Sequence, residues 1–356
     1  MRKLYLNKMR STIKTKMFAL LAGIAFCSGV KAQDVHFSQM YYSPLTLNPA
    51  LVGLDYPIQA AVNYRSQWRS VASPYSTIAA SFDARLNENK RRKKGIFALG
   101  INFFNDQAGD ARISTTNANI HAGYHLIIDR KSTIGAAIYT GYGQRSINTS
   151  AGRWGNQFDG LGYNPALPSG EYFMSDSFGY LDVGTGVVYN RVQNEGYITS
   201  NNQKDITFGV AAYHLSRPQY SFLNTNDDRL YMRFSAFFKG TFGIQNTNLS
   251  LVPAVYYQRQ GKAQELLIGT YFRYMIVEQS KITGFNKGTF LSLGAFYRNK
   301  DAMALKAMIE FNDFSLGFAY DVNISSLTVV SNARGGFELF LRYGLTKGLA
   351  GNRSRI

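Results

Sequence analysis

The histidines of the chain are the side chains best suited to metal binding or to acid–base chemistry near neutral pH. There are four, His36, His121, His125 and His214. A spacing of four residues, as between His121 and His125, brings two side chains to one face of a helix, about 6 Å apart. On a strand it separates them by roughly 13 Å, too far to share a zinc ion. We predict structural or lumen-lining histidines, no metal site and no cofactor.

An outer-membrane hydrolase is an alternative, with a Ser and one of these histidines on a barrel wall. The sequence contains no Gly-x-Ser-x-Gly elbow and no Ser, His and acid cluster at a recognisable spacing. Its single cysteine, Cys27, falls in an N-terminal leader, so the mature chain has no thiol nucleophile and no disulfide. We predict that the protein is not an enzyme.

Residues 1–32 have the pattern of a cleaved signal peptide. Their first half is basic and contains no acidic residue, and an apolar core follows over 17–26. The segment ends in Val30-Lys31-Ala32, the small-x-small pattern that signal peptidase accepts. This leaves Gln33 as the first mature residue. The apolar core is too short for an uncleaved anchor, which must cross about 30 Å of hydrocarbon. We predict an exported protein.

The formal charge of +17 overstates the basicity of the mature chain, because the leader holds seven of the 39 Lys and Arg residues. The mature chain keeps 32 Lys and Arg residues against 22 Asp and Glu residues, and most of the basic residues are spread along the chain. The exception is the run 90–94, which we predict to be a solvated turn that touches anionic head groups or a partner. We predict no nucleic-acid partner.

Alternation with a period of two recurs along the chain after the leader and predicts strands with one apolar face. In 314–323, Phe314, Leu316, Phe318, Tyr320 and Val322 share one face, and small or polar residues share the other. Bulky apolar residues opposite small, polar and charged ones are typical of a wall between lipid and lumen. The chain also carries 24 Tyr and 25 Phe, as aromatic girdles require.

We therefore predict an all-β fold, a transmembrane outer-membrane β-barrel of about 14 antiparallel strands. The predicted domains are the signal peptide at 1–32, an N-terminal periplasmic or plug segment at 33–57, the barrel at 58–345 and a tail at 346–356. The predicted strands lie near 58–68, 75–87, 95–106, 111–128, 132–147, 178–192, 205–216, 230–244, 249–260, 264–277, 288–299, 302–311, 314–324 and 335–345.

Connection lengths predict which end of the barrel faces outward, since outer-membrane barrels have long outer loops and short inner turns. The segments 148–177, 217–229 and 325–334 become extracellular and Asn312-Asp313 becomes a periplasmic turn. Pro253 falls inside a predicted strand, where it removes a ladder donor. We expect a strand start or a bulge there.

The segment Gln33–Gly53 has too many aromatic and leucine side chains for a solvated tail, and its Ser-Pro and Asn-Pro dipeptides favour turns. We expect it to plug the lumen, to pack under the barrel or to dock a partner. Ordinary packing against the first strand is the alternative.

This segment closely resembles the start of the PorP/SprF family of outer-membrane proteins, which work with type IX secretion and gliding motility. The family pattern is Q-D-P-x-F-S-Q-Y-x-x-x-P-x-x-x-N-P-A-x-x-G, here with Val35 for Pro and Met40 for Tyr. The matching positions are Gln33, Asp34, Phe37, Ser38, Gln39, Pro44, Asn48, Pro49, Ala50 and Gly53.

Later motifs extend the resemblance over essentially the whole mature chain. The segments 122–126 and 251–253 resemble two family strands, and Phe337 replaces a usual His before Glu338. The remaining matches that the resemblance marks as partner-docking candidates are Tyr64, Arg65, Gln67, Trp68, Tyr320, Asp321 and Glu338.

The resemblance implies outer-membrane lipid, type IX secretion components and a large secreted surface protein with a C-terminal sorting domain as partners. The protein would assist the export or surface anchoring of that cargo. In the long loop, Trp154, Phe158, Tyr163 and Tyr172 would supply aromatic contact area. The alternative is that they form an interfacial girdle or pack within the loop.

The alternative is a diffusion channel for small solutes, whose lumen would carry Arg65, Arg145, Arg233, Lys239 and Arg273 and would favour anions.

Overall fold

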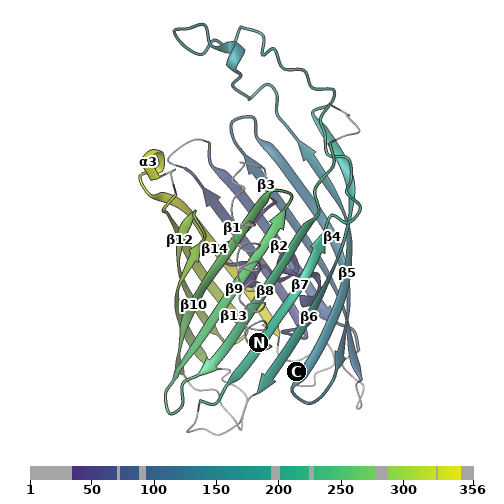
Figure 1. Ribbon diagram of the computed structural model, residues 1–356, viewed down its shortest axis with the longest axis vertical. Coiled ribbons are helices and arrows are strands. Elements are labelled where there is room, and N and C mark those ends of the chain that lie inside the picture. Colours follow the sequence, from purple (N-terminus) through teal and green to yellow (C-terminus); the bar gives the residue numbers. More distant parts are fainter. Residues whose placement is uncertain are drawn as a thin grey trace, which may run out of the picture.

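The structure is a computed structural model that describes residues 34–69, 73–87, 94–193, 201–223, 228–277, 288–325 and 328–345. These residues form a closed barrel of fourteen antiparallel strands in sequence order, with the last strand paired to the first (Figure 1). The predicted all-β barrel and its strand number are confirmed.

All fourteen predicted segments coincide with strands, and most boundaries agree within two residues. The strands are β1 (Ile58–Gln67), β2 (Tyr75–Arg85), β3 (Gly95–Ala108), β4 (Ile113–Ile127), β5 (Ser132–Ser146), β6 (Ser177–Gln193), β7 (Lys204–Tyr213), β8 (Arg233–Gly243), β9 (Leu249–Gln260), β10 (Ala263–Val277), β11 (Thr289–Arg298), β12 (Ala302–Phe311), β13 (Phe314–Asn323) and β14 (Arg334–Leu345).

Burial alternates along the strands as the sequence pattern predicts. In β13 the aromatic and aliphatic side chains from Phe314 to Tyr320 point outward, and the small and polar residues between them are buried inside. The outward set forms the apolar face that lipid requires. Among the described residues, no helix is both long and apolar enough to cross a membrane.

Antiparallel order places alternate connections at opposite ends of the barrel. One end, here the loop end, carries residues 147–176, residues 214–223 and 228–232, and the short helix α3 (Thr328–Ser331). Residues 147–176 extend farthest beyond the strands (Figure 1). The other end, here the turn end, carries the tight turn Asn312-Asp313. The basic run 90–94 is described only at Lys94, which lies at the turn end.

The expectation for Pro253 is wrong. Pro253 is neither a strand start nor a bulge but lies inside β9, paired with Thr270 of β10 in unbroken register. The ladder to β8 lacks two successive pairs, between Ala254 and Leu251, and resumes in the same register. A proline has no N–H to donate, so the ladder loses bonds locally without gaining a residue.

Residues 34–57, here the lumen segment, run inside the barrel as a chain of short turns (Figure 1, purple). They include η1 (Met40–Tyr42), α2 (Pro44–Leu47) and η2 (Pro49–Leu51). Their apolar side chains share one buried core with lumen-facing residues such as Phe237, Tyr256 and Phe340. The barrel core is therefore built from this segment. The predicted signal peptide, Gln33 and the tail 346–356 lie outside the described residues.

Candidate functional site

A charged cluster on the barrel wall holds the backbone of the lumen segment. The N–H groups of Ser38 and Gln39 donate to the two carboxylate oxygens of Glu338, at 2.7 and 2.8 Å. The Ser38 hydroxyl lies 2.8 Å from both carboxylate oxygens of Asp321. The carbonyl of Ser38 accepts a hydrogen bond from the Lys306 ammonium.

Two arginines complete this cluster. Arg65 donates to Asp321 at 3.0 Å and to the carbonyl of His36 at 2.9 Å. Arg298 lies 3.1 Å from Asp321 and 3.0 Å from Glu265. Charged groups can be buried stably only when they are paired and hydrogen-bonded. The charged cluster, formed by Arg65, Glu265, Arg298, Lys306, Asp321 and Glu338, balances three cations with three carboxylates.

Asn48 ties the middle of the lumen segment to two strands. Its side-chain N–H₂ donates to the carbonyls of Val187 in β6, at 3.2 Å, and Val210 in β7, at 3.0 Å. Its side-chain oxygen accepts from the N–H of Ala50, which caps η2. The strand residue beside it must be a glycine, because a Cβ on Gly186 would lie 2.1 Å from the Asn48 oxygen.

Gly53 closes the segment against β2 and β3. Its φ of +64° lies in the left-handed region, which favours glycine. Its N–H donates to Asp83 at 2.7 Å, and its carbonyl accepts from Arg85 at 2.6 Å. A Cβ here would lie 2.5 Å from the Cβ of Ala98. The motif therefore ends on glycine for both conformational and steric reasons.

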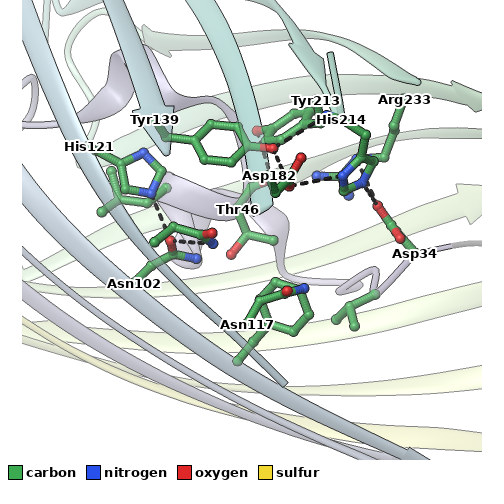
Figure 2. Close-up of a pocket in the computed structure, with 14 residues that line it drawn as sticks. Asp34, Thr46, Asn102, Asn117, His121, Tyr139, Asp182, Tyr213, His214 and Arg233 are labelled. Atoms are coloured by element: carbon green, nitrogen blue, oxygen red, sulfur yellow. Dashed lines mark hydrogen bonds and ion pairs between the residues drawn. The ribbon is translucent and has the colours of Figure 1, made fainter. Parts of the chain in front are cut away.

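Asp34, at the start of the described chain, lies in an ionic network at the loop end. Figure 2 shows His214 between Asp34 and Asp182, at 2.5 and 2.9 Å. Arg233 lies 3.6 Å from Asp34, and the Tyr139 hydroxyl donates to Asp182 at 2.7 Å. The network joins the lumen segment to β5, β6, β8 and the connection after β7.

The network shifts the pKa values of His214 and Asp34, both of which lie outside the strands. Burial opposes protonation of His214, but the Asp34 charge and the hydrogen bonds that the imidazolium donates to both carboxylates outweigh it and raise the pKa of His214 to about 9. Burial opposes ionisation of Asp34, yet His214 and Arg233 hold the pKa of that carboxyl below its ordinary value. A charged pair is therefore favoured at neutral pH.

Aromatic residues of the lumen segment fill the remaining space. Tyr42 stacks on Phe340 with ring centroids 3.9 Å apart. The Tyr41 hydroxyl lies 2.9 Å from the carbonyl of Phe238 and 2.8 Å from that of Val255. These carbonyls lie beside the interrupted part of the β8–β9 ladder. Phe37, Pro44, Pro49 and Ala50 are buried as well.

The barrel residues of the family motifs fall into three groups. Arg65, Asp321 and Glu338 belong to the charged cluster. Tyr64 and Tyr320 lie on the outward phase of their strands, and Tyr64 packs near Phe337 with ring centroids 5.9 Å apart. Gln67 and Trp68 line a cavity of about 260 Å³ at the loop end, beside His36 and Arg298.

The candidate cargo residues lie on the long connection 147–176 at the loop end. Trp154 packs inside this connection against Phe173, with ring centroids 5.7 Å apart, and its indole N–H donates to the Thr149 carbonyl at 3.1 Å. Phe158, Tyr163 and Tyr172 are exposed. Trp154 therefore supports the fold of the connection, whereas the other three side chains are accessible.

His121 and His125 line the lumen and are hydrogen-bonded. His121 Nε2 lies 2.7 Å from the side-chain oxygen of Asn102, and His125 Nε2 lies 2.6 Å from the carbonyl of Val52. Within the described ranges, no group of three or more His, Cys, Asp or Glu side chains is arranged to hold a metal ion.

Sequence reasoning missed several residues of this site. Arg298, Lys306 and Glu265 complete the charged cluster, and Arg85 holds Gly53. All four lie on the buried, inward phase of their strands, so charge on that phase is the signal that marks them. The pairing of Asp34 with His214 joins residues 180 positions apart and has no local signal.

Comparison with protein families identifies the chain. Residues 29–343 match the family described as Type IX secretion system membrane protein PorP/SprF. The chain belongs to the PorP/SprF family. This family is a group of secretion-system membrane proteins and not an enzyme family. With the closed barrel and its apolar outer face, the PorP/SprF assignment places the protein in the outer membrane.

Solved structures similar to this PorP/SprF protein are outer-membrane barrels. The TodX deltaS2S3 mutant monoaromatic hydrocarbon channel shares 8% identity with a TM-score of 0.46, over 84% of this chain and 93% of that one. A Pseudomonas aeruginosa FadL homologue shares 10% identity with a TM-score of 0.40, over 83% and 92%. No curated protein sequence matches the chain.

Proposed function

We propose that this barrel, without catalysing a reaction, assists the export or cell-surface anchoring of one large secreted protein. The proposed partner is an adhesin-like, gliding-related protein with a C-terminal sorting domain, together with other type IX secretion components. The PorP/SprF assignment supports association with secretion components. We propose the class of cargo here and its binding surface below.

The observation that carries the proposal is the filled lumen. The family motif packs as the barrel core, and its backbone is held by the buried carboxylates of Asp321 and Glu338. A barrel of this size encloses water unless something fills it. A filled lumen favours a protein that recognises its partner through its loops and outer wall over a protein that lets solutes pass.

The diffusion channel is the weaker candidate, because the lumen cations are largely engaged. Arg65 and Arg233 pair with carboxylates, Arg273 pairs with Glu310 at 2.7 Å, and Arg145 stacks on Tyr220. Of these cations, Arg145 and Lys239 have no ion-pair partner among the described residues. A solute path would require displacement of the lumen segment.

We place cargo contact on the exposed aromatic residues of 147–176. Aromatic side chains supply large contact area at interfaces, and Tyr172 is 76% exposed with no role in the packing of the barrel. The test is affinity purification of the tagged protein from detergent-solubilised outer membranes, followed by mass spectrometry. The wild type is compared with the triple variant Phe158→Ser, Tyr163→Ser, Tyr172→Ser.

The wild type should recover a large secreted surface protein or secretion components, and the triple variant should recover at least tenfold less of the cargo. Ser169→Ala, in the same connection, is the matched control and should behave as wild type. A wild-type barrel that recovers no secreted protein and conducts ions in planar bilayers would refute the proposal and favour the channel.

A further inference from the structure

A second cavity lies between the lumen segment and the turn end of the barrel. Its volume is about 220 Å³, and Tyr42 and Tyr56 of the lumen segment form part of its lining. The other lining residues are Asp55 of the same segment, Gln203 just before β7, and residues of strands β6–β12 and β14. Drug-sized ligands occupy pockets of about 300–1,000 Å³, so this cavity suits a smaller molecule or the end of a chain.

One cation of this cavity makes no ion pair at contact distance, although Asp55 in the same lining interacts with it electrostatically. Arg273 and Arg342 both pair with Glu310, at 2.7 and 3.4 Å. No carboxylate among the described residues lies within 4.0 Å of the Lys239 ammonium. Its neighbours are the rings of Tyr41 and Tyr42, whose centroids lie 5.9 and 6.0 Å away. An ammonium inside a barrel is stabilised by an anion with which it can form charge-assisted hydrogen bonds.

Two further polar groups in the lining are buried without a partner in the described chain. The Ser292 hydroxyl is fully buried and makes no hydrogen bond. One carboxylate oxygen of Asp205 is bound by Gln203, whereas the other is buried and unpaired. Unpaired buried polar groups are costly, so a ligand that pairs with them gains affinity.

The unpaired groups specify the ligand chemistry. The ammonium requires an anion, the hydroxyl can donate to that anion, and the unpaired carboxylate oxygen requires an N–H donor. Lys239 on β8 and Ser292 on β11 are three strands apart, roughly 14 Å along the wall at about 4.8 Å per strand. A ligand that carries a carboxylate next to an amide N–H satisfies both requirements. The carboxy-terminal end of a peptide is such a ligand.

We propose that the turn-end cavity binds a peptide-like carboxylate. The Lys239 ammonium pairs with the carboxylate, the Ser292 hydroxyl donates to it, and the free oxygen of Asp205 accepts an amide N–H. Arg273 and Arg342 remain bound to Glu310 and keep that acid from repelling the ligand. The source of the carboxylate is either a chain terminus or a free small acid. This site does not depend on the proposed cargo role.

The test is isothermal titration calorimetry with the purified full chain in detergent. The probes are N-acetyl-alanyl-alanine, the same dipeptide with a C-terminal amide, and acetate. The acid should bind at least tenfold more tightly than the amide, because the amide lacks the charge that Lys239 recognises. Binding of the dipeptide acid well above that of acetate assigns a chain terminus, and equal binding assigns a free carboxylate.

Variants identify the residues. Lys239→Gln should weaken binding of the acid at least tenfold, and Lys239→Arg should retain it. Lys204→Gln, which removes an exposed lysine at the same end of the barrel, should have no effect. Ser292→Ala should weaken binding independently of the ammonium. Equal binding of acid and amide to the wild type, or full binding by folded Lys239→Gln, would overturn the proposal.

Discussion

At the scale of residues, the fit between lumen segment and wall depends on side chains that leave no room for substitution. Asn48 fills the space beside Gly186, and Gly53 touches Ala98. Close packing of this kind makes single added methyl groups costly. The motif residues are thus explained by packing and hydrogen bonding inside the barrel. The aromatic positions Tyr64 and Tyr320 face lipid and are explained by the membrane instead.

Gly53→Ala should destabilise the protein by about 2–4 kcal/mol, from backbone strain and overpacking together. The matched control is Gly109→Ala. Gly109 has a similar φ of +70°, yet a Cβ there meets no atom within 4 Å. The control should therefore lose only the backbone part, about 1–2 kcal/mol. Equal losses in thermal or urea unfolding of the two variants would show that the contact with Ala98 is unimportant.

The Asp34–His214 pair should make stability depend on pH. The pKa of His214 is raised to about 9 in the folded protein, so its contribution is complete below pH 6.5 and is lost as the pH rises through about 9. The pKa of Asp34 is lowered, so its contribution is present above its ordinary pKa and declines in acid. The thermal unfolding midpoint should fall between pH 6.5 and 9.5, and Asp34→Asn should reduce that slope.

At the scale of elements, the lumen segment fills the middle of the barrel and leaves a cavity on either side of it. It separates the loop-end cavity, which includes His36 and Trp68, from the turn-end cavity, which includes Tyr42 and Lys239. Its attachment is spread over contacts with nearly every side of the wall. Loss of one contact should therefore loosen the segment without opening the barrel.

Deletion of residues 34–55 should open a conducting path in planar bilayers, whereas the wild type should be silent. The physical reason is that the deletion removes the apolar side chains that fill the lumen core. A deletion within the long loop, residues 155–170, is the control and should stay silent. Conductance of the wild type equal to that of the lumen deletion would contradict this view of the segment.

At the scale of the whole molecule, an apolar outer wall surrounds a polar and aromatic interior. Leu181, Ile138 and Phe318 face outward, and the paired charges lie inside. This arrangement is the opposite of that in a soluble barrel and suits a lipid environment. The long connection 147–176 joins β5 and β6 and extends beyond the strands on that side of the barrel (Figure 1).

Ile138→Arg, halfway along β5 on the lipid face, should cost about 2–4 kcal/mol of stability, because a charge near the bilayer centre is poorly solvated. Leu161→Arg is the control. Leu161 is 98% exposed on the long loop outside the wall, and its substitution should change stability by less than about 0.5 kcal/mol. Unfolding in lipid vesicles measures both, and equal losses would argue against the membrane position of β5.

Strand number and inside–outside phase were predictable from the sequence alone, because alternation is a local property of each segment. The family motifs in the sequence also include Ser38, Asp321 and Glu338. The sequence could not reveal that Ser38 lies on Asp321, which is 283 positions away, or that Arg298 and Lys306 complete the cluster. Those contacts exist only after β14 closes on β1 and the lumen segment packs inside. Tertiary structure alone decided them, since closure brings together wall positions that no local pattern relates.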